Sequence, residues 1–206
     1  MDPERLPRWL AGFAERHGRY EAGVDGGVLR LVAADGALAE CHAPPGAGPA
    51  TDEPAFRTEA TRARRIGLLL ARRGGVAVGI ANGDALEVSK VDSRYVQGRT
   101  AAGGWSQHRF ARRRENQARA AAADGADVAV RLLVPAAPGL AAVVTGGDRR
   151  AVDTILADAR LASVAARRAE RFLTVAEPKH AALEAAVRQA RAVRIRVVEP
   201  DLTASA

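Results

Sequence analysis

Three strand-length runs of small and branched apolar residues lie close together between residues 65 and 91. Their sequences are RIGLLLA (65–71), GVAVGIAN (75–82) and ALEVSKV (85–91). Arg73-Gly74-Gly75 separates the first two runs and Asn82-Gly83-Asp84 the last two, and both suit hairpin turns. This is the strongest β signal in the chain. It predicts a three-stranded antiparallel meander whose last strand leads into the segment beginning at Arg94.

The remainder of the chain is predicted to add helices and further strands to that meander. Residues 126–134 fit either a strand or a helix by pattern, after a break at Asp124-Gly125. A buried strand over Leu140–Thr145 precedes a helix capped by Asp148. Short strands are expected at 172–175 and 193–199, on either side of a helix over 177–191. The sum is an α/β (α+β) fold, a mixed sheet of about five or six strands flanked by helices.

The first 55 residues are expected to form a small appendage. Residues 3–17 predict an amphipathic helix, and residues 28–33 and 37–41 predict two strands joined at Asp35-Gly36. The next stretch, residues 41–56, holds four prolines and two glycines and is predicted to be a linker. We therefore expect an appendage and linker over 1–55, a larger domain over 56–200 and a tail over 201–206.

Positive charge is concentrated between Arg94 and Arg119. This stretch holds seven arginines and one acid, Glu115, so it accounts for nearly all of the net charge of +7 that the whole chain carries. An arginine- and alanine-rich composition explains scattered arginines, but it does not explain their gathering beside a run of glycines. Concentrated positive charge suits contact with a phosphate backbone, so nucleic acid is the expected partner.

The same stretch has two physically different halves. Residues 97–104 contain Gly98, Gly103 and Gly104 and no large apolar side chain, which predicts an exposed loop. From Ser106, the expected N-cap, the pattern predicts a helix. Helical spacing places one stripe of polar residues along that helix, formed by Arg109, Arg112, Arg113, Asn116 and Arg119.

Several other kinds of protein fit the sequence poorly. One cysteine, Cys41, excludes an internal disulfide and argues against a cysteine-ligated metal. The N-terminus does not have the pattern of a signal peptide, and no apolar run is long enough to span a membrane. There is no P-loop. A zinc site is not supported, because the histidines lack ligand spacing. A ribonuclease-H-like two-metal site is not supported either, because Asp84, Glu87 and Asp92 have no evident partners for a carboxylate cluster. We expect no cofactor and no metal.

The order of these parts resembles the central domain of eukaryotic and archaeal peptide-chain release factors and of Pelota. In that family a Gly-Gly-Gln loop leads into an arginine-rich helix. Here Gly103-Gly104 and RFAR (109–112) fall at the matching spacing, and LAAVVTGGDRRAVDTIL (140–156) resembles the following strand, turn and helix. The similarity covers roughly residues 62–199. It implies a ribonuclease-H-like release-factor central domain in which residues 126–134 continue as helix.

The loop departs from the family pattern at one point. Trp105 stands where the glutamine is expected, and Gln107 follows two residues later. This arrangement is closer to the Vms-like peptidyl-tRNA hydrolases, release-factor relatives that free nascent chains from stalled large ribosomal subunits. The resemblance implies that Gln107 is catalytic, and that the partners are peptidyl-tRNA and the ribosome or its large subunit.

The remaining roles follow from that resemblance and from side-chain chemistry. An uncharged amide can donate and accept hydrogen bonds at once, so Gln107 suits the orientation of a water. Gly103 and Gly104 would let the backbone, with Ser106 beside it, approach the tRNA end. Trp105 either stacks on a base or folds back onto the sheet. The expected RNA contacts are made by Arg109, Arg112 and Arg113, and less strongly by Arg94 and Arg99.

The sequence therefore predicts a hydrolase that acts on the peptidyl-tRNA ester in ribosome rescue. We expect it to be a cytoplasmic monomer without a membrane partner. Gln107 could instead be an ordinary first-turn residue, and the arginines an ordinary solvated face. His108 could act as a base but is more readily incidental. Two other functions stay open: a nuclease that cuts tRNA near its CCA end, and a non-catalytic adaptor that binds ribosomes or RNA.

Overall fold

The chain folds into two compact units, each with its own sheet and its own apolar core. The structure is a computed structural model that describes residues 1–72, 75–93 and 107–200, except for the side chains of residues 93 and 107–118. One unit comprises residues 1–63 and 188–206, and the other comprises residues 64–187. The predicted α+β class is confirmed.

The larger unit is built on a five-stranded sheet with the order β6-β5-β4-β7-β8. The first three strands are the predicted meander, in which β4 pairs with β5 and β5 with β6, all antiparallel. The other two run parallel to β4. The bounds are β4 (Arg65–Arg72), β5 (Gly75–Asn82), β6 (Ala85–Ser93), β7 (Ala142–Gly147) and β8 (Arg168–Leu173). The predicted turn at Asn82-Gly83-Asp84 is also confirmed, and Gly83 supplies its left-handed backbone with φ +59°.

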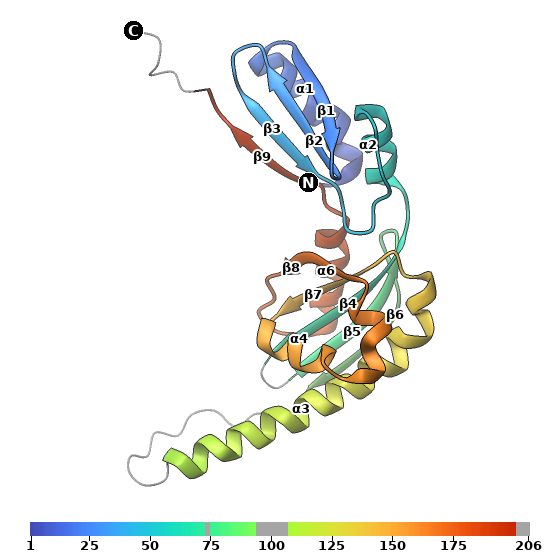
Figure 1. The fold of residues 1–206 in the computed structure, drawn as a ribbon, viewed down its shortest axis with the longest axis vertical. Coiled ribbons are helices and arrows are strands. Elements are labelled where there is room, and N and C mark those ends of the chain that lie inside the picture. The colour runs from blue at the N-terminus through green and yellow to red at the C-terminus, as the bar shows by residue number, and fades with distance from the viewer. Residues whose placement is uncertain (73–74, 94–106, 201–206) are drawn as a thin grey trace. The chain divides into compact units, whose positions relative to one another are not determined.

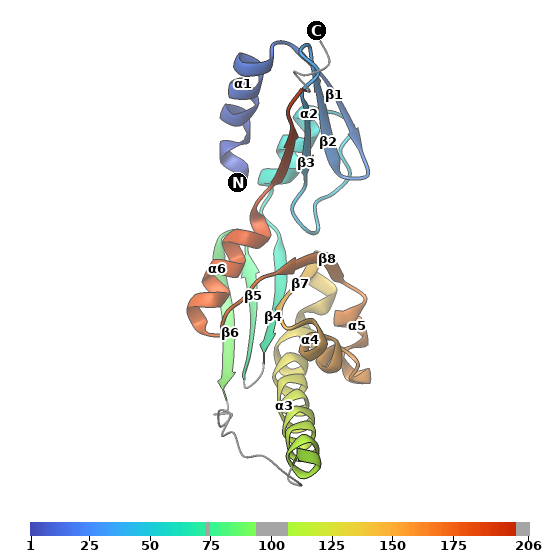
Figure 2. The ribbon, with the colours of Figure 1, turned by 90° about the vertical axis from the view of Figure 1, so that its left-hand side faces the viewer.

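Helices cover both faces of this sheet (Figure 2). On one face, buried side chains of β4, β5 and β7 form the main core with α3, α4 and α5 and the short turns around them. On the other face lies α6, whose Leu183 side chain comes within 3.5 Å of the position that a Cβ on Gly79 would occupy. The bounds are α3 (Gln107–Ala136), η2 (Ala137–Gly139), α4 (Arg149–Leu156), η3 (Ala159–Leu161), α5 (Ala162–Ala165) and α6 (His180–Arg191).

The break predicted at Asp124-Gly125 is wrong, because α3 passes through both residues without interruption. The glycine serves packing instead of a turn. A Cβ at Gly125 would lie 2.9 Å from Cδ1 of Ile155 on α4, closer than real side chains approach. Gly125 therefore allows α3 to pack closely against α4. The helical alternative for residues 126–134 is confirmed.

The turn between β7 and α4 agrees with the prediction. The carboxylate of Asp148 accepts a hydrogen bond of 3.2 Å from the backbone N–H of Ala151, which caps α4. Just before it, Gly147 has φ +98°, and a Cβ there would collide with the carbonyl of Ala71. Only glycine allows this turn to fold so closely over the end of β4.

The smaller unit has a four-stranded antiparallel sheet with the order β1-β2-β3-β9. The predicted amphipathic helix is confirmed as α1, whose Leu6, Leu10 and Phe13 are buried in a core with Leu29 and Leu31 of β2. The bounds are η1 (Pro3–Arg5), α1 (Leu6–His17), β1 (Tyr20–Asp25), β2 (Val28–Ala33), β3 (Leu38–His42), α2 (Glu53–Thr61) and β9 (Arg194–Val198).

Two segments differ from the sequence-based expectations. The predicted linker over 41–56 ends in α2, whose first turn is capped by Asp52 through a 2.8 Å hydrogen bond from the Ala55 N–H. Phe56 of α2 is buried. The last strand, expected with the larger domain, pairs instead with β3, with Leu38 opposite Val198. Local pattern identifies a strand but not the sheet edge that it will join.

Candidate active site

The strand ends locate the segment that carries the predicted site. In the larger sheet β4, β6, β7 and β8 all run in one direction, and Ser93 at the end of β6 pairs with Gly75. The segment 94–106 therefore leaves the sheet at the end where Arg72 and Gly147 also lie. This is the edge formed by the carboxyl ends of the strands, where loops of α/β proteins often carry sites.

Six of the predicted site residues lie outside the described part of the chain: Arg94, Arg99, Gly103, Gly104, Trp105 and Ser106. The structure places the backbone of the other four, Gln107, Arg109, Arg112 and Arg113. Gln107 is the first residue of α3, and the three arginines belong to its first two turns. The predicted helix is thus confirmed from Gln107 onward, while the capping role of Ser106 stays a prediction.

The beginning of α3 extends past the end of the five-stranded sheet (Figure 1). Arg119 and Ala120 are exposed, and burial starts further along the helix. Ala126, Val128, Ala129 and Leu133 are buried against the sheet and α4. The packed half holds the helix in place, so the arginine-rich half is carried outward from the sheet.

A charged contact also ties the packed half of α3 to η3. Arg160 donates to the Asp127 carboxylate of α3 at 2.8 Å and to the Asp158 carboxylate at 2.7 Å. Hydrogen bonds from Arg160 hold the pKa of Asp158 at about 2, below its ordinary value of 3.8. All three side chains are at least partly exposed, so these ion pairs contribute little to the stability of the fold.

The structure adds two arginines that the sequence analysis did not single out. Arg72, at the end of β4, donates from Nη1 to the carbonyl oxygens of Val175 at 3.3 Å and Ala176 at 2.7 Å. Arg149, the first residue of α4, lies over the ring of Phe172 with 4.2 Å to its centroid. The Asp-Arg-Arg sequence after a glycine turn signals a helix start, but no sequence pattern predicts the contact with Phe172.

Within the described ranges, no group of three or more histidine, cysteine, aspartate or glutamate side chains could hold a metal ion. Over the same residues, no helix is both long enough and apolar enough to cross a membrane.

Comparison with known proteins identifies the family. The model of a family described as the actinobacteria/chloroflexi VLRF1 release factor matches residues 64–196, more than half of the chain. The match includes the arginine-rich segment and α3, and it ends within β9. The chain therefore belongs to this family of release factors. Membership associates it with translation and with the ribosome.

Other comparisons add little. No curated protein matches the chain. A solved structure described as an archaeal protein matches with a TM-score of 0.41 and 16% sequence identity. The match covers 76% of this chain and 48% of the archaeal chain.

Proposed function

We propose that this protein is a ribosome-dependent peptidyl-tRNA hydrolase that releases nascent chains from stalled ribosomes or large subunits. The observation that carries the proposal is the release-factor family match, which spans the glycine-containing segment and α3. The residues of that segment resemble the Vms-like hydrolases more closely than the Gly-Gly-Gln release factors. The cytoplasm, where ribosomes work, is the expected compartment.

In this proposal Gln107 orients the attacking water. The water oxygen adds to the ester carbonyl carbon that links the peptide to the terminal ribose of tRNA. The carbonyl–ribose C–O bond then breaks, and the proton lost by the water passes to the departing ribose oxygen. The products are a free peptide acid and an intact tRNA. Holding the water and the ester in one geometry is the main source of acceleration.

The position of Gln107 at the start of α3 supports this chemistry. The first backbone N–H groups of a helix have no acceptor within the helix. Donors of this kind can stabilise negative charge on the carbonyl oxygen as the tetrahedral intermediate forms. Gly103 and Gly104 would give the backbone close access to the tRNA end, next to Ser106.

The arginines are proposed to hold RNA. Arg109, Arg112 and Arg113 would contact phosphates of tRNA or ribosomal RNA, with Arg94 and Arg99 nearer the loop. Trp105 would stack on a tRNA base. The protein is proposed to act as a monomer.

The decisive experiment measures hydrolysis of peptidyl-tRNA on isolated large subunits. Gln107→Ala should lower the release rate at least about a hundredfold, because an ester held without an oriented water reacts slowly. Sedimentation with large subunits should be unchanged in that variant. Gln117→Ala makes the same change ten residues further along α3 and should release at the wild-type rate.

Other outcomes would change the mechanism or the function. Full hydrolysis by Gln107→Ala removes the glutamine from the mechanism. Binding without release by any variant favours the adaptor. Mapping the 3′ end of the released tRNA separates ester hydrolysis, which keeps the CCA end, from a nuclease, which shortens it.

A further inference from the structure

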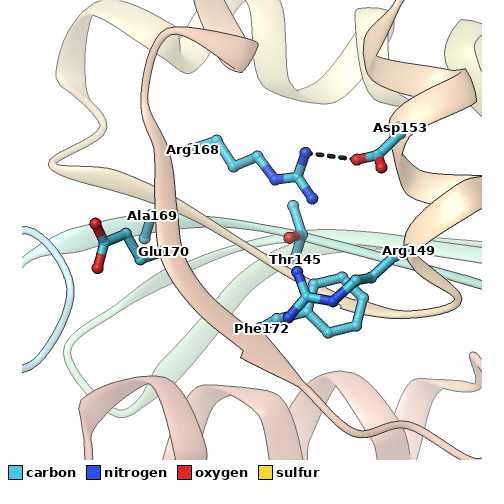
Figure 3. A pocket seen from close by; sticks show the side chains of 7 residues that line it. All are labelled: Thr145, Arg149, Asp153, Arg168, Ala169, Glu170 and Phe172. Atoms are coloured by element: carbon cyan, nitrogen blue, oxygen red, sulfur yellow. Dashed lines mark hydrogen bonds and ion pairs between the residues drawn. The ribbon is translucent and has the colours of Figure 1, made fainter.

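A pocket of about 380 Å³ lies in the larger unit between α4 and the edge strand β8. Its walls include Thr145 of β7, Arg149 and Asp153 of α4, and Arg168 and Phe172 of β8 (Figure 3). These residues are all distinct from those assigned to the peptidyl-tRNA site. No motif in the sequence analysis pointed to them as a group.

An irregularity in strand pairing opens this pocket. Val143 of β7 pairs with Arg168, and Thr145 pairs with Phe172, so two steps along β7 correspond to four along β8. The extra residues bulge from the edge strand at 169–171. Bulges at sheet edges redirect side chains, and here both Arg168 and Phe172 line the same hollow.

The hydroxyl of Thr145 is the least expected group in the pocket. Thr145 is 0% exposed, and its Oγ1 has no hydrogen-bond partner among the described residues. A buried hydroxyl without a partner is costly, and most such groups in proteins are paired. An unpaired hydroxyl on the wall of a pocket points to a ligand that completes it.

Two guanidinium groups lie on either side of that hydroxyl (Figure 3). Arg168 donates from Nη1 to the Asp153 carboxylate at 2.6 Å, which fixes its orientation and leaves its other terminal nitrogen without a hydrogen bond to any described residue. Arg149 rests on the Phe172 ring and makes no ion pair with a described carboxylate.

The acidic side chains leave this space open to an anion. Asp153 is engaged with Arg168, and the carboxylate of Glu170 points away from Thr145 and both arginines (Figure 3). Because Thr145 is fully buried, a ligand reaches its hydroxyl only when a side chain at the pocket mouth shifts. Arg149 is exposed and flexible enough to move in this way.

We propose that Thr145, Arg149 and Arg168 bind a phosphate group in this pocket. A phosphate offers several acceptor oxygens, which suit the forked donors of two arginines together with one hydroxyl. The pocket volume also leaves room for the sugar attached to a phosphate. The ligand is either a phosphodiester of an RNA strand or a free phosphate compound, and both present the same oxygens.

The test measures thermal unfolding of the full chain in inorganic phosphate, against chloride at equal ionic strength. Phosphate should raise the melting temperature of the wild type. Thr145→Val and Arg149→Gln should each lose most of this rise, with affinity lowered about tenfold. Arg150→Gln makes the same charge change at an exposed neighbouring position and should keep the full rise.

The threonine variant gives a second, opposite readout. Valine has nearly the shape of threonine without the hydroxyl, so Thr145→Val should melt at a higher temperature than the wild type when phosphate is absent. A purely structural role for Thr145 predicts no loss of the phosphate effect. Equal phosphate shifts in all four proteins, or none in the wild type, would overturn the proposal.

Binding to a short single-stranded RNA distinguishes the two sources of phosphate. If Thr145→Val and Arg149→Gln weaken RNA binding as well, the ligand is an RNA phosphodiester. If they weaken only inorganic phosphate binding, the ligand is a free phosphate compound. Both measurements report binding alone, so the result stands whether or not the protein hydrolyses peptidyl-tRNA.

Discussion

The two halves of α3 differ in almost every physical respect although they form one continuous helix. Residues 107–118 carry four arginines and a single large apolar side chain, Phe110. The other half buries Ala126, Val128, Ala129 and Leu133 in the main core. Because a helix is stiff over this length, stability of the packed half fixes the position of the half that is proposed to meet RNA.

The difference predicts that stability and RNA binding respond to separate sets of mutations. Substitutions in the packed half should lower the free energy of unfolding, whereas substitutions in the first turns should lower affinity alone.

Leu133→Ala should have the largest effect on stability. Leu133 is fully buried, so truncation removes apolar contacts and leaves a cavity. The free energy of unfolding should fall by about 2 to 5 kcal/mol, measured by urea denaturation. Leu132→Ala, the same change at the half-buried neighbouring position, should cost clearly less. Equal losses at the two positions would contradict the described packing of α3.

Neutralising Arg109, Arg112 and Arg113 together with glutamine should weaken binding to large subunits. If each arginine contacts one phosphate, the slope of log affinity against log salt should decrease in magnitude by roughly 2 to 3. The urea midpoint should stay at the wild-type value, since this half of the helix extends past the sheet.

A charge-matched triple variant controls for the change in net charge. It replaces exposed arginines elsewhere with glutamine, namely Arg131, Arg188 and Arg194. If both triple variants change the salt slope equally, general charge and not the first turns of α3 determines binding.

The smallest effect is expected at the contact between α3 and η3, and it depends on pH. The pKa of Asp158 is lowered to about 2, mainly by hydrogen bonds from Arg160. A lowered pKa means that the contribution to stability is present above the ordinary pKa of 3.8 and is lost as pH falls toward 2.

Urea unfolding of Asp158→Asn checks this sign. At pH 6 the variant should unfold at a slightly lower urea concentration than the wild type, and near pH 2 the two midpoints should converge. A difference that persists unchanged at pH 2 would mean that the charge of the Asp158 carboxylate does not account for its contribution to stability.

Local signals in the sequence determined much of the larger unit. Alternating turns and apolar runs specified β4, β5 and β6, and Asp148 specified the start of α4, because hairpins and caps depend on a few adjacent residues. The pattern after Ser106 predicted the helix that begins at Gln107, and the order of the parts indicated the release-factor family that the comparison then established.

Tertiary contacts decided the rest. Asp124-Gly125 has the sequence of a break, yet α3 is continuous there, and the absence of a side chain at Gly125 leaves room for Ile155 of α4. β9 pairs with β3 in the smaller sheet, and no local sequence pattern specifies which of the two sheets it joins. The pocket around Thr145 exists only because a bulge in β8 brings distant side chains together. These contacts join residues that are far apart in the sequence and depend on the whole fold, so only the structure reveals them.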